Sequence, residues 1–468
     1  MIRRAQNCFA GLAICIVALS SCGGDEGNRA QNVAPQFTSA TSISVIENTT
    51  GAFYQASATD SNGDQLSYTL SGPDAGAFSL SSSGALSFRE PPNFDLAVDG
   101  NGDNTYEVSI IVSDGRGGSA NLPVSVVVSN SREGIAVTRI LSGLTDAVAL
   151  ASNRTDAELV IGLKNGDVLT INGLDGEELS LVNVFGSFSG RNIELLGITR
   201  GLINQRIAPT LLVAARSDDG SILVIPAREF GFPIGNFTGP GSMAARVAIG
   251  FADDESIYLA IGDPEGSFAQ DEDSGFGKIH KIAAAADPYA GASIRFYDFS
   301  RVASGVRAPN GITAAEGGIL FSDRGAVISD EINRYSGAAN LNFGWPLREG
   351  NTVRTEGGSS LIPPLLAIPL GGNARESTGI VGPIIYSGPI ASLKDMVISA
   401  DADGTIWTFS KSRLGANSEL LPSMLEVRTE DFTPDVGAID NPIAFATDAN
   451  GTLYILDGDG EVFRVGES

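Results

Sequence analysis

The stretch "LVIGLKNGDVLTI", residues 159–171, shows the pattern on which the C-terminal part of the chain is built. Two apolar runs flank an Asn-Gly pair, and this dipeptide strongly favours a tight turn between antiparallel strands. The stretch therefore predicts a β-hairpin, and five similar units follow it. They are "LLVAARSDDGSILVIP" (211–226), "IYLAIGDPE" with "GKIHKI" (257–265 and 277–282), "GILFSDRGAVISDEINRY" (318–335), "DMVISADADGTIWTF" (395–409) and "TLYILDGDGEVFRV" (452–465).

Hairpins of this size, recurring through residues 136–468, predict a repeat architecture. In a radial array of β-sheets each sheet buries both faces against its neighbours, and closure of the ring removes the free edges. A parallel α/β fold would need amphipathic helices between the strands, whereas the connecting segments here are rich in Gly and Pro. We therefore predict a six-bladed β-propeller over residues 136–468.

Residues 35–132 predict a second all-β domain. Short runs in which polar and apolar residues alternate, such as "TSISVIE" and "TYEVSIIVSD", are separated by Gly, Asp, Asn and Ser. Period-2 runs at this spacing are typical of a β-sandwich. The predicted fold class is all-β, with a β-sandwich followed by a six-bladed β-propeller.

The charge of the chain is strongly acidic. There are 55 Asp and Glu residues against 30 Lys and Arg, which gives a formal net charge of -25. Such a surface repels nucleic acid phosphates and anionic membrane faces, and it attracts divalent cations. We therefore expect no nucleic acid partner.

The first 22 residues have the layout of a secretory signal. Two arginines precede an apolar run that ends in "LSSC", and the cysteines of the chain are Cys8, Cys15 and Cys22. The ending resembles a bacterial lipobox, which implies lipidation of Cys22 and a polar tether over residues 23–34. Acyl chains would hold the protein on a membrane. Because Gly23 follows the cysteine, the resemblance implies the outer membrane, facing the periplasm or the cell surface; an ordinary signal peptide is the alternative.

Two loops of the sandwich domain, "DSNGD" (60–64) and "DGNGD" (99–103), offer oxygen side chains at alternating positions. Side-chain oxygens around a glycine turn are suited to a hard cation such as Ca²⁺. Asp, Asn and Gly also make ordinary hairpin turns, which is the alternative interpretation. Further acidic residues, Glu47, Asp95 and Asp114, favour the metal.

The same residues carry a resemblance to the cadherin family over about residues 35–130. The segments concerned are "SVIENTTGAFYQASATDSNGDQLSYTL" and "PPNFDLAVDGNGDNTYEVSIIVSDGRGG". The resemblance implies Ca²⁺ binding, with a partner in adhesion, although "VVVSNSRE" stands where the family has its closing linker. The implied metal ligands, with Asp114 added from the residues alone, are Glu47, Asp60, Asn62, Asp64, Asp95, Asp99, Asn101, Asp103 and Asp114.

The propeller resembles the soluble glucose/sorbosone dehydrogenase family, whose members bind pyrroloquinoline quinone (PQQ) and Ca²⁺. The resemblance spans residues 136–468 and is carried by "SGVRAPNGITAAEGGILFSDRG", "DEINRYSGAANLNFGWPLREGN" and "YLAIGDPEGSFAQDEDSGFGKIHKI". It implies a cofactor site at Arg307, Asp323 and Trp345. The residues that match the family's segments are Arg307, Pro309, Gly311, Asp323, Asp330, Glu331, Asn333, Gly344, Trp345 and Pro346.

The sequence departs from this family at two places. In "ELLGITRGL", Gly201 stands where the resemblance implies the catalytic histidine, and Ala308 replaces an asparagine beside the quinone. The only histidine, His280, is expected to be a strand residue, because its motif "GKIHKI" reads as the second half of a hairpin. We therefore predict no catalytic residue, with Glu194 or Asp323 as the alternative base.

Two functions remain after the sequence analysis. The first is a membrane-anchored, calcium-binding protein whose degenerate propeller binds a carbohydrate or a surface protein, with Arg307, Trp345 and Glu349 at the channel mouth. The alternative is a PQQ-dependent aldose dehydrogenase with a replacement base. Homophilic adhesion is a third possibility that rests on fold analogy alone.

Overall fold

The structure is a computed structural model that describes residues 31–152, 157–186, 192–201, 210–227, 233–238, 245–252, 256–284, 297–355, 361–415 and 420–468. The chain divides into two compact units. The described residues of the first unit lie within 31–43, 50–90 and 105–127, and those of the second lie within 44–49, 91–104 and 128–468. None of the helices in the described residues has the length and hydropathy needed to cross a bilayer.

The first unit is a β-sandwich built on β1–β9. One sheet has the order β2 (Ser42–Ile46), β9 (Ser119–Ser129), β8 (Thr105–Ser113) and β5 (Ser67–Ser71). The other has the order β3 (Ala52–Gln55), β7 (Ala85–Phe88) and β6 (Phe78–Leu80), while β1 (Gln36–Phe37) pairs with β4 (Ala58–Thr59). A single 3-10 turn, η1 (Ala75–Ala77), precedes β6. In β8 every second side chain is buried, as expected for a strand that packs one face on a core.

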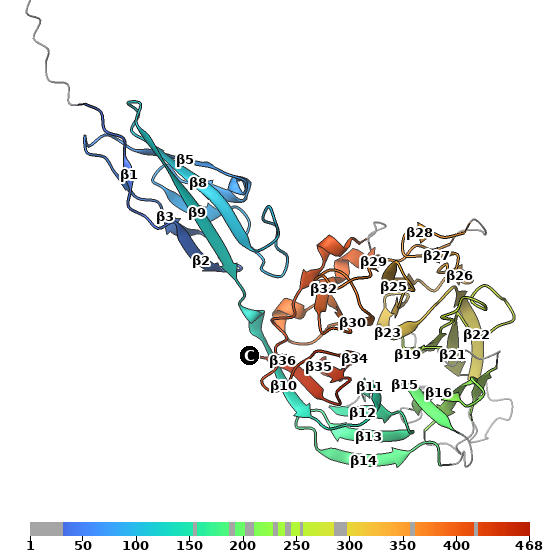
Figure 1. Cartoon of the computed structure of the whole chain (residues 1–468). Helices are drawn as coiled ribbons and strands as arrows, with labels where there is room; N and C mark the ends of the chain where they lie inside the picture. The colour runs from blue at the N-terminus through green and yellow to red at the C-terminus, as the bar shows by residue number, and fades with distance from the viewer. Residues whose placement is uncertain are drawn as a thin grey trace, which may run out of the picture. The chain divides into compact units, whose positions relative to one another are not determined.

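The second unit is a six-bladed β-propeller, and Figure 1 shows its sheets arranged radially around a central axis. Its strands follow blade by blade. Blade 1 is β11 (Ala147–Ser152), β12 (Glu158–Leu163), β13 (Asp167–Asn172) and β14 (Glu178–Asn183); blade 2 is β15 (Ile193–Gly201), β16 (Thr210–Ser217), β17 (Ile222–Pro226) and β18 (Gly235–Phe237). Blade 3 is β19 (Val247–Phe251), β20 (Ile257–Ile261), β21 (Lys278–Ala284) and β22 (Tyr297–Ser304), with β26 (Leu341–Asn342) added outside β22. Blade 4 is β23 (Pro309–Ala315), β24 (Gly318–Asp323), β25 (Ser329–Tyr335) and β29 (Leu366–Pro369). Blade 5 is β30 (Ile380–Ile385), β31 (Met396–Asp401), β32 (Ile406–Ser410) and β33 (Glu426–Val427).

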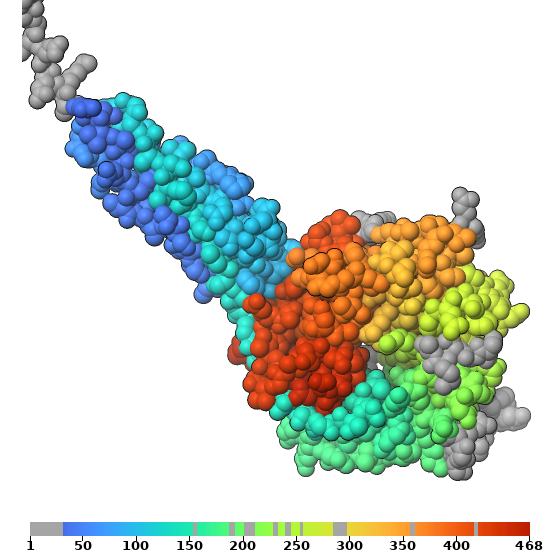
Figure 2. Space-filling model, in the orientation of Figure 1, coloured from blue at the N-terminus to red at the C-terminus, as the bar shows by residue number. Residues whose placement is uncertain are grey.

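Blade 6 closes the ring. It has the order β34 (Pro442–Thr447), β35 (Leu453–Asp457), β36 (Val462–Glu467) and β10 (Ile135–Leu141), so the first strand of the propeller pairs with its last. Figure 2 shows the start of the propeller (teal to green) directly beside its end (red). Outside the blades lie the hairpin β27 (Arg348–Glu349) and β28 (Thr352–Val353), and the 3-10 turns η2 (Arg132–Gly134), η3 (Ala391–Leu393), η4 (Lys411–Gly415) and η5 (Pro422–Met424).

The predicted fold class is confirmed. Each hairpin of the sequence analysis forms the second and third strands of a blade, as in β12 and β13. Strands such as β17, β20 and β35 are buried at every residue, because both faces of a blade pack on neighbouring blades. The innermost strands approach each other closely: a Cβ on Gly311 would lie 2.3 Å from the Gly382 carbonyl oxygen, so only glycine fits there.

Candidate functional site

The first strand of each blade lines a central channel. The channel has a volume of about 680 Å³ and is bounded by β11, β15, β19, β23, β30 and β34. Its walls are mostly Gly, Ala, Ile, Val and Thr. Among the described lining residues the ionisable side chains are Arg200, Glu316, Lys411 and Asp448. Asp448 accepts hydrogen bonds from the backbone of Asn450 and Thr452 and from the Tyr454 hydroxyl, so this carboxylate is held in a turn.

The first strands all begin at one end of the channel, here called the entry mouth. Arg216, at the end of β16, donates to the Ala245 carbonyl before β19 and pairs with Glu194 at the start of β15. Arg324, after β24, donates from Nε to the Ile380 carbonyl at the start of β30, over 3.1 Å. Arg307 precedes β23 at the same mouth.

Gly201, which stands where the resemblance implies the catalytic histidine, lies far from Arg307 in the structure. Gly201 is the last residue of the nine-residue strand β15, so it lies at the mouth opposite to Arg307. A strand of this length spans about 30 Å at roughly 3.3 Å per residue. Position 201 and the predicted cofactor contact at Arg307 therefore lie at opposite ends of the channel.

Arg307 and Trp345 form a packed cradle behind the channel wall. The Arg307 Nη1 donates to the Arg324 and Gly325 carbonyls over 2.9 and 2.5 Å, and its guanidinium lies 5.1 Å from the centre of the Trp345 ring. Arg354 lies 5.4 Å from the centre of the same ring, and the indole N–H donates to the Asp263 carbonyl over 2.7 Å. Trp345 is 7% exposed, and the hollow beside it measures about 10 Å³, the size of one water.

Asp323 ties the loop before β23 to the end of β24. Its carboxylate accepts the backbone N–H groups of Arg307 and Ala308. Burial, and then the negative charge of Glu331, raises the pKa of Asp323 to about 8. The next two blades repeat the arrangement: Asp401 accepts the N–H groups of Thr378 and Gly379, and Asp457 accepts those of Asp440 and Asn441. A residue repeated in this way braces a blade.

The "DEIN" motif has a similar structural role. Asp330 accepts the N–H of Ile380 and the hydroxyl of Ser377, each over 2.7 Å, which joins blade 4 to blade 5. Glu331 accepts the N–H of Gly350 over 2.6 Å and the side-chain amide of Asn333 over 2.9 Å. Burial raises the pKa of Glu331 to about 7.

Glu349, predicted at the channel mouth, is also engaged in the structure. Its Oε1 accepts three successive N–H groups, of Ala326, Val327 and Ile328, each over 2.7 Å, and its Oε2 pairs with Arg354 over 3.1 Å. Burial raises the pKa of Glu349, but these hydrogen bonds outweigh it and hold the pKa below its usual value. The side chain is therefore an acceptor for the loop rather than a group offered to a ligand.

The predicted PQQ residues do not fit the cofactor. None of Arg307, Asp323 and Trp345 lines the central channel; all three line the small hollow in the cradle. A tricyclic quinone cannot occupy a space of about 10 Å³. The three side chains instead hold each other and the backbone in place. In this arrangement the cradle of Arg307 and Trp345 offers no surface to PQQ.

His280 lies in β21, the third strand of its blade, and is 6% exposed. Its Nε2 is 3.0 Å from the Gly275 carbonyl oxygen, and its ring centre is 4.4 Å from that of Phe237. Burial lowers its pKa to about 4, so the imidazole stays neutral at physiological pH. It does not line the channel. These contacts place it as a core residue of blade 3.

Glu194, the alternative base, is ion-paired. Its carboxylate contacts Arg216 and lies 3.0 Å from the Lys164 ammonium. Burial raises the pKa of Glu194, but the hydrogen bonds from Arg216 and Lys164 outweigh burial and hold the pKa below its usual value. A carboxylate stabilised in its charged form is a weak proton acceptor.

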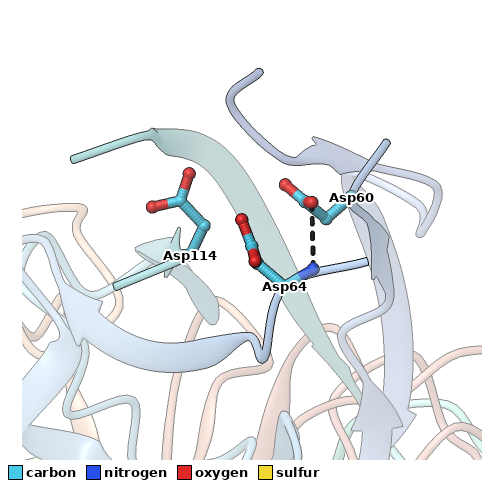
Figure 3. A group of neighbouring side chains, drawn as sticks. All are labelled: Asp60, Asp64 and Asp114. Atoms are coloured by element: carbon cyan, nitrogen blue, oxygen red, sulfur yellow. Dashed lines mark hydrogen bonds between the residues drawn. The ribbon is translucent and has the colours of Figure 1, made fainter. Parts of the chain in front are cut away.

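In the first unit, Asp60, Asp64 and Asp114 form an acidic triad, and Figure 3 shows the three side chains gathered at one place. Each contributes an oxygen that lies within 4.8 Å of the others. The Asp64 side chain is 6% exposed; its Oδ1 is 3.1 Å from Arg116, while its Oδ2 has no hydrogen-bond partner. The buried Oδ2 of Asp60 also has no partner. Unpaired buried carboxylate oxygens of this kind suit a hard cation.

The other predicted metal ligands do not join the triad. Asn62 uses its Oδ1 to accept the Val33 N–H. Asp99 accepts the N–H groups of Gly102, Asp103 and Asn104, and Asn101 donates to Asp103, so this loop is a self-contained turn. Glu47 accepts the N–H groups of Phe94 and Ser131. The hairpin-turn alternative therefore describes the second loop better than a metal site does.

Asp95 lies in the second unit, where burial and then the charge of Asp431 raise its pKa to about 8. The Arg428 Nε, in the same unit, is 3.5 Å from Asp95 and 3.0 Å from Asp431. Arg428 is 2% exposed. A buried guanidinium already occupies the position of a counterion between these carboxylates, so Asp95 is part of a buried ion-pair group.

The comparisons with known proteins match this architecture. Residues 236–359 match the Glucose / Sorbosone dehydrogenase family. Residues 32–127 match the Bacterial Ig domain family. The matched part of the propeller is thus similar to glucose/sorbosone dehydrogenases, and the sandwich is similar to bacterial Ig domains. The family model that matches the sandwich is the Ig family and not the cadherin family. No curated protein sequence matches the chain.

Solved structures share the propeller fold. The soluble aldose sugar dehydrogenase of Escherichia coli, in its apo form, superposes with a TM-score of 0.51 at 17% identity, covering 71% of this chain and all of that one. Two glucose dehydrogenase structures superpose with TM-scores of 0.52 at 18% and 19% identity, each covering 71% of this chain and 100% or 99% of the other. At this identity the likeness shows the fold alone.

Sequence reasoning missed two residues at the entry mouth, Arg246 and Arg324. For Arg246 the available signal was positional, because in "AARVAIG" the arginine stands just before the first strand of a blade, as Arg307 does in "GVRAPNG". Arg324 follows β24, and its place in the sequence carries no such signal. The lipidation prediction at Cys22 lies outside the described residues.

Proposed function

We propose that the propeller is a carbohydrate-binding module that does no redox chemistry, carried by a calcium-binding Ig-like domain. The proposal rests on the contacts of the residues that match the glucose/sorbosone dehydrogenase motifs. Arg307, Asp323 and Trp345 are tied into a cradle with room for one water, and the channel itself remains open at about 680 Å³. A cavity of this size accommodates a small ligand.

The positions of the candidate bases among the described residues support the same function. His280 is buried in blade 3 away from the channel, and Glu194 is stabilised as a charged ion pair. Asp323, the other alternative base, accepts two backbone N–H groups outside the channel lining. General-base catalysis contributes about 10²–10⁴-fold to a rate, so a dehydrogenase without it would be slow. Calorimetric titration of the full chain with mono- and oligosaccharides tests the binding. No heat with any saccharide would contradict the proposal.

For the Ig-like domain we propose one Ca²⁺ at Asp60, Asp64 and Asp114. The two carboxylate oxygens without hydrogen-bond partners, on Asp60 and Asp64, support this ligand set. Ca²⁺ takes six to eight oxygen ligands in most protein sites, so backbone oxygens and water would complete the coordination. Its removal by a chelator is expected to lower the melting temperature of the full chain.

We further propose that lipidation of Cys22 anchors the protein to the outer membrane, facing the periplasm or the cell surface. The lipobox-like "LSSC" and the lack of any later cysteine support this assignment. Mass spectrometry of the protein purified from a bacterial membrane tests it. Unmodified protein, cleaved elsewhere and recovered in the soluble fraction, would exclude the anchor.

The second candidate function is a PQQ-dependent aldose dehydrogenase, and the match of residues 236–359 to the dehydrogenase family favours it. It requires the cradle around Trp345 to open. Sugar-dependent reduction of a redox dye by protein supplied with PQQ and Ca²⁺ distinguishes it from the first function. Equal reduction with and without PQQ would exclude it.

A further inference from the structure

The outer strand of blade 1, β14, is exposed along its whole length. All six of its residues are exposed, and the side chains of Leu179, Leu181 and Val182 are 47%, 55% and 51% exposed. Figure 1 shows β14 on the outer rim of the propeller, and within the described residues its sheet ends at this strand. An apolar edge strand of this kind offers unpaired backbone groups to another chain, and most folds cover or blunt such edges.

The outer strands of blades 3–6 are covered. In blade 3, β26 pairs with β22, and in blade 4 Leu420 bridges to β29. In blade 5 the Val427 N–H of β33 donates to the Asp95 carbonyl over 2.9 Å, and in blade 6 Pro434 bridges to β10. Among the described residues β14 has no comparable cover. The open edge of blade 1 is therefore a departure from the pattern of these four blades.

The hydrogen-bond register fixes which backbone groups of β14 point outward. Val184, the residue after the strand, donates its N–H to the Gly166 carbonyl over 2.9 Å, and β13 and β14 keep the same register as far as Ser180. In an antiparallel pair, alternate residues direct their N–H and C=O groups to the partner strand. Those of Leu181 and Asn183 therefore point away from β13, where a further strand could pair with them.

The start of β14 is acidic. Asp175, Glu177 and Glu178 are all exposed, and within the described part of the chain the carboxylates of Glu177 and Glu178 form no salt bridge. Lys164, in the turn before β13, is paired with Glu194 over 3.0 Å. This edge therefore attracts a basic segment, whereas a second copy of a chain with a net charge of -25 is repelled.

We propose that β14 binds an extended segment of a partner protein, with alternating apolar residues and a Lys or Arg at its ends, as a further strand of blade 1. Backbone hydrogen bonds to Leu181 and Asn183 would pair the two strands, and Glu177 and Glu178 would select the charge. The apolar side chains of β14 supply the contact area. Because β14 does not line the channel, this surface is independent of the proposed carbohydrate binding.

The test measures the binding of three synthetic peptides to the full chain by fluorescence polarisation at one fixed ionic strength. The first peptide alternates valine and threonine between terminal lysines, and the second has terminal glutamates instead. The third has proline in place of the central valine of the first, so it lacks one ladder donor. We expect saturable binding of the lysine-ended peptide, binding of the glutamate-ended peptide weaker by about tenfold or more, and no binding of the proline peptide. Hydrogen exchange should show protection of residues 178–183 when the lysine-ended peptide binds.

Two variants of the chain separate the backbone contribution from the charge. Leu181→Pro removes an outward N–H and leaves the hydrogen bonds to β13 in place, so it should abolish peptide binding. Glu177→Gln combined with Glu178→Gln should weaken binding of the lysine-ended peptide about tenfold, as expected for the loss of two exposed ion pairs. The matched control, Glu272→Gln with Asp273→Asn, removes two exposed charges from a loop of blade 3 and should bind as the wild type does. A melting curve for each variant excludes unfolding as the cause of lost binding.

The outcomes decide the occupant of the edge. No saturable binding of the lysine-ended peptide, equal binding of the lysine- and glutamate-ended peptides, or binding that leaves residues 178–183 unprotected would each overturn the proposal. Self-association of the chain in sedimentation, lost in Leu181→Pro, would show that a second copy occupies β14 and would also overturn it. Saccharide binding should be the same in Leu181→Pro and in the wild type, so the failure of either proposal is seen separately.

Discussion

Asp323 and Asp401 occupy the same position in adjacent blades, and each carboxylate accepts two backbone N–H groups from the segment that enters the first strand of its own blade. Asp457 does the same in blade 6. The aspartate that the dehydrogenase resemblance implies as a cofactor contact is therefore one member of a structural repeat. Its retention in the sequence follows from the fold and requires no cofactor.

The first prediction concerns this brace. Asp323→Asn and Asp401→Asn each remove one acceptor and leave a buried N–H unpaired. We expect each to lower the free energy of unfolding by about 1–3 kcal/mol. Asp273→Asn, at an exposed position in a loop, is the control and should change it by less than about 0.5 kcal/mol. Urea unfolding followed by fluorescence measures the difference, and an Asp323→Asn protein as stable as the control would contradict the bracing role.

The second prediction is a pH dependence of stability. The pKa of Asp323 in the folded protein is about 8 and that of Glu331 about 7, both above the values expected for the unfolded chain. Between about pH 4 and pH 8 the folded state binds more protons than the unfolded state, so these groups make stability fall as pH rises. The double variant Asp323→Asn and Glu331→Gln should show a flatter profile over this range. A wild-type profile that rises from pH 5 to pH 8 as steeply as that of the double variant would exclude the effect.

The fold was predictable because its signal is repeated. Six hairpins with apolar strands on both sides of Gly-containing turns leave few architectures open, and ring closure by β10 and β36 follows from having one strand left over at the start. The site was less predictable. Arg307 and Trp345 match a family motif, but only the packing shows that they contact each other and not the channel. In the acidic loops, the spacing of the residues alone could not distinguish the two carboxylates. Asp64 has an oxygen without a hydrogen-bond partner, whereas Asp99 accepts N–H groups of its own turn.

The third prediction tests the calcium site in the Ig-like domain. Ca²⁺ should raise the melting temperature of the full chain, and Asp64→Asn should abolish that increase because it removes an unpaired anionic oxygen. Asp99→Asn is the matched control, since its carboxylate is occupied by backbone N–H groups, and it should retain the response to Ca²⁺. A response lost in Asp99→Asn and kept in Asp64→Asn would move the metal to the other loop.

The fourth prediction concerns His280. His280→Phe keeps a ring against Phe237 and removes the hydrogen bond to the Gly275 carbonyl, so the free energy of unfolding should fall by about 1 kcal/mol. Because the pKa of His280 is lowered to about 4, the wild type loses stability from this group as pH falls from 6.5 to 4, and the variant should lack that contribution. Saccharide binding should be unchanged. Loss of binding without loss of folding would give the histidine a functional role.

The central claim, that the propeller binds a sugar without a redox cofactor, is tested most directly by titrating the purified full chain with PQQ in the presence of Ca²⁺ and following the quinone absorbance. The account predicts no saturable change, and no dependence on Arg307→Gln. Saturable binding at one equivalent per chain, lost in Arg307→Gln and followed by sugar-dependent dye reduction, would contradict it and establish the dehydrogenase.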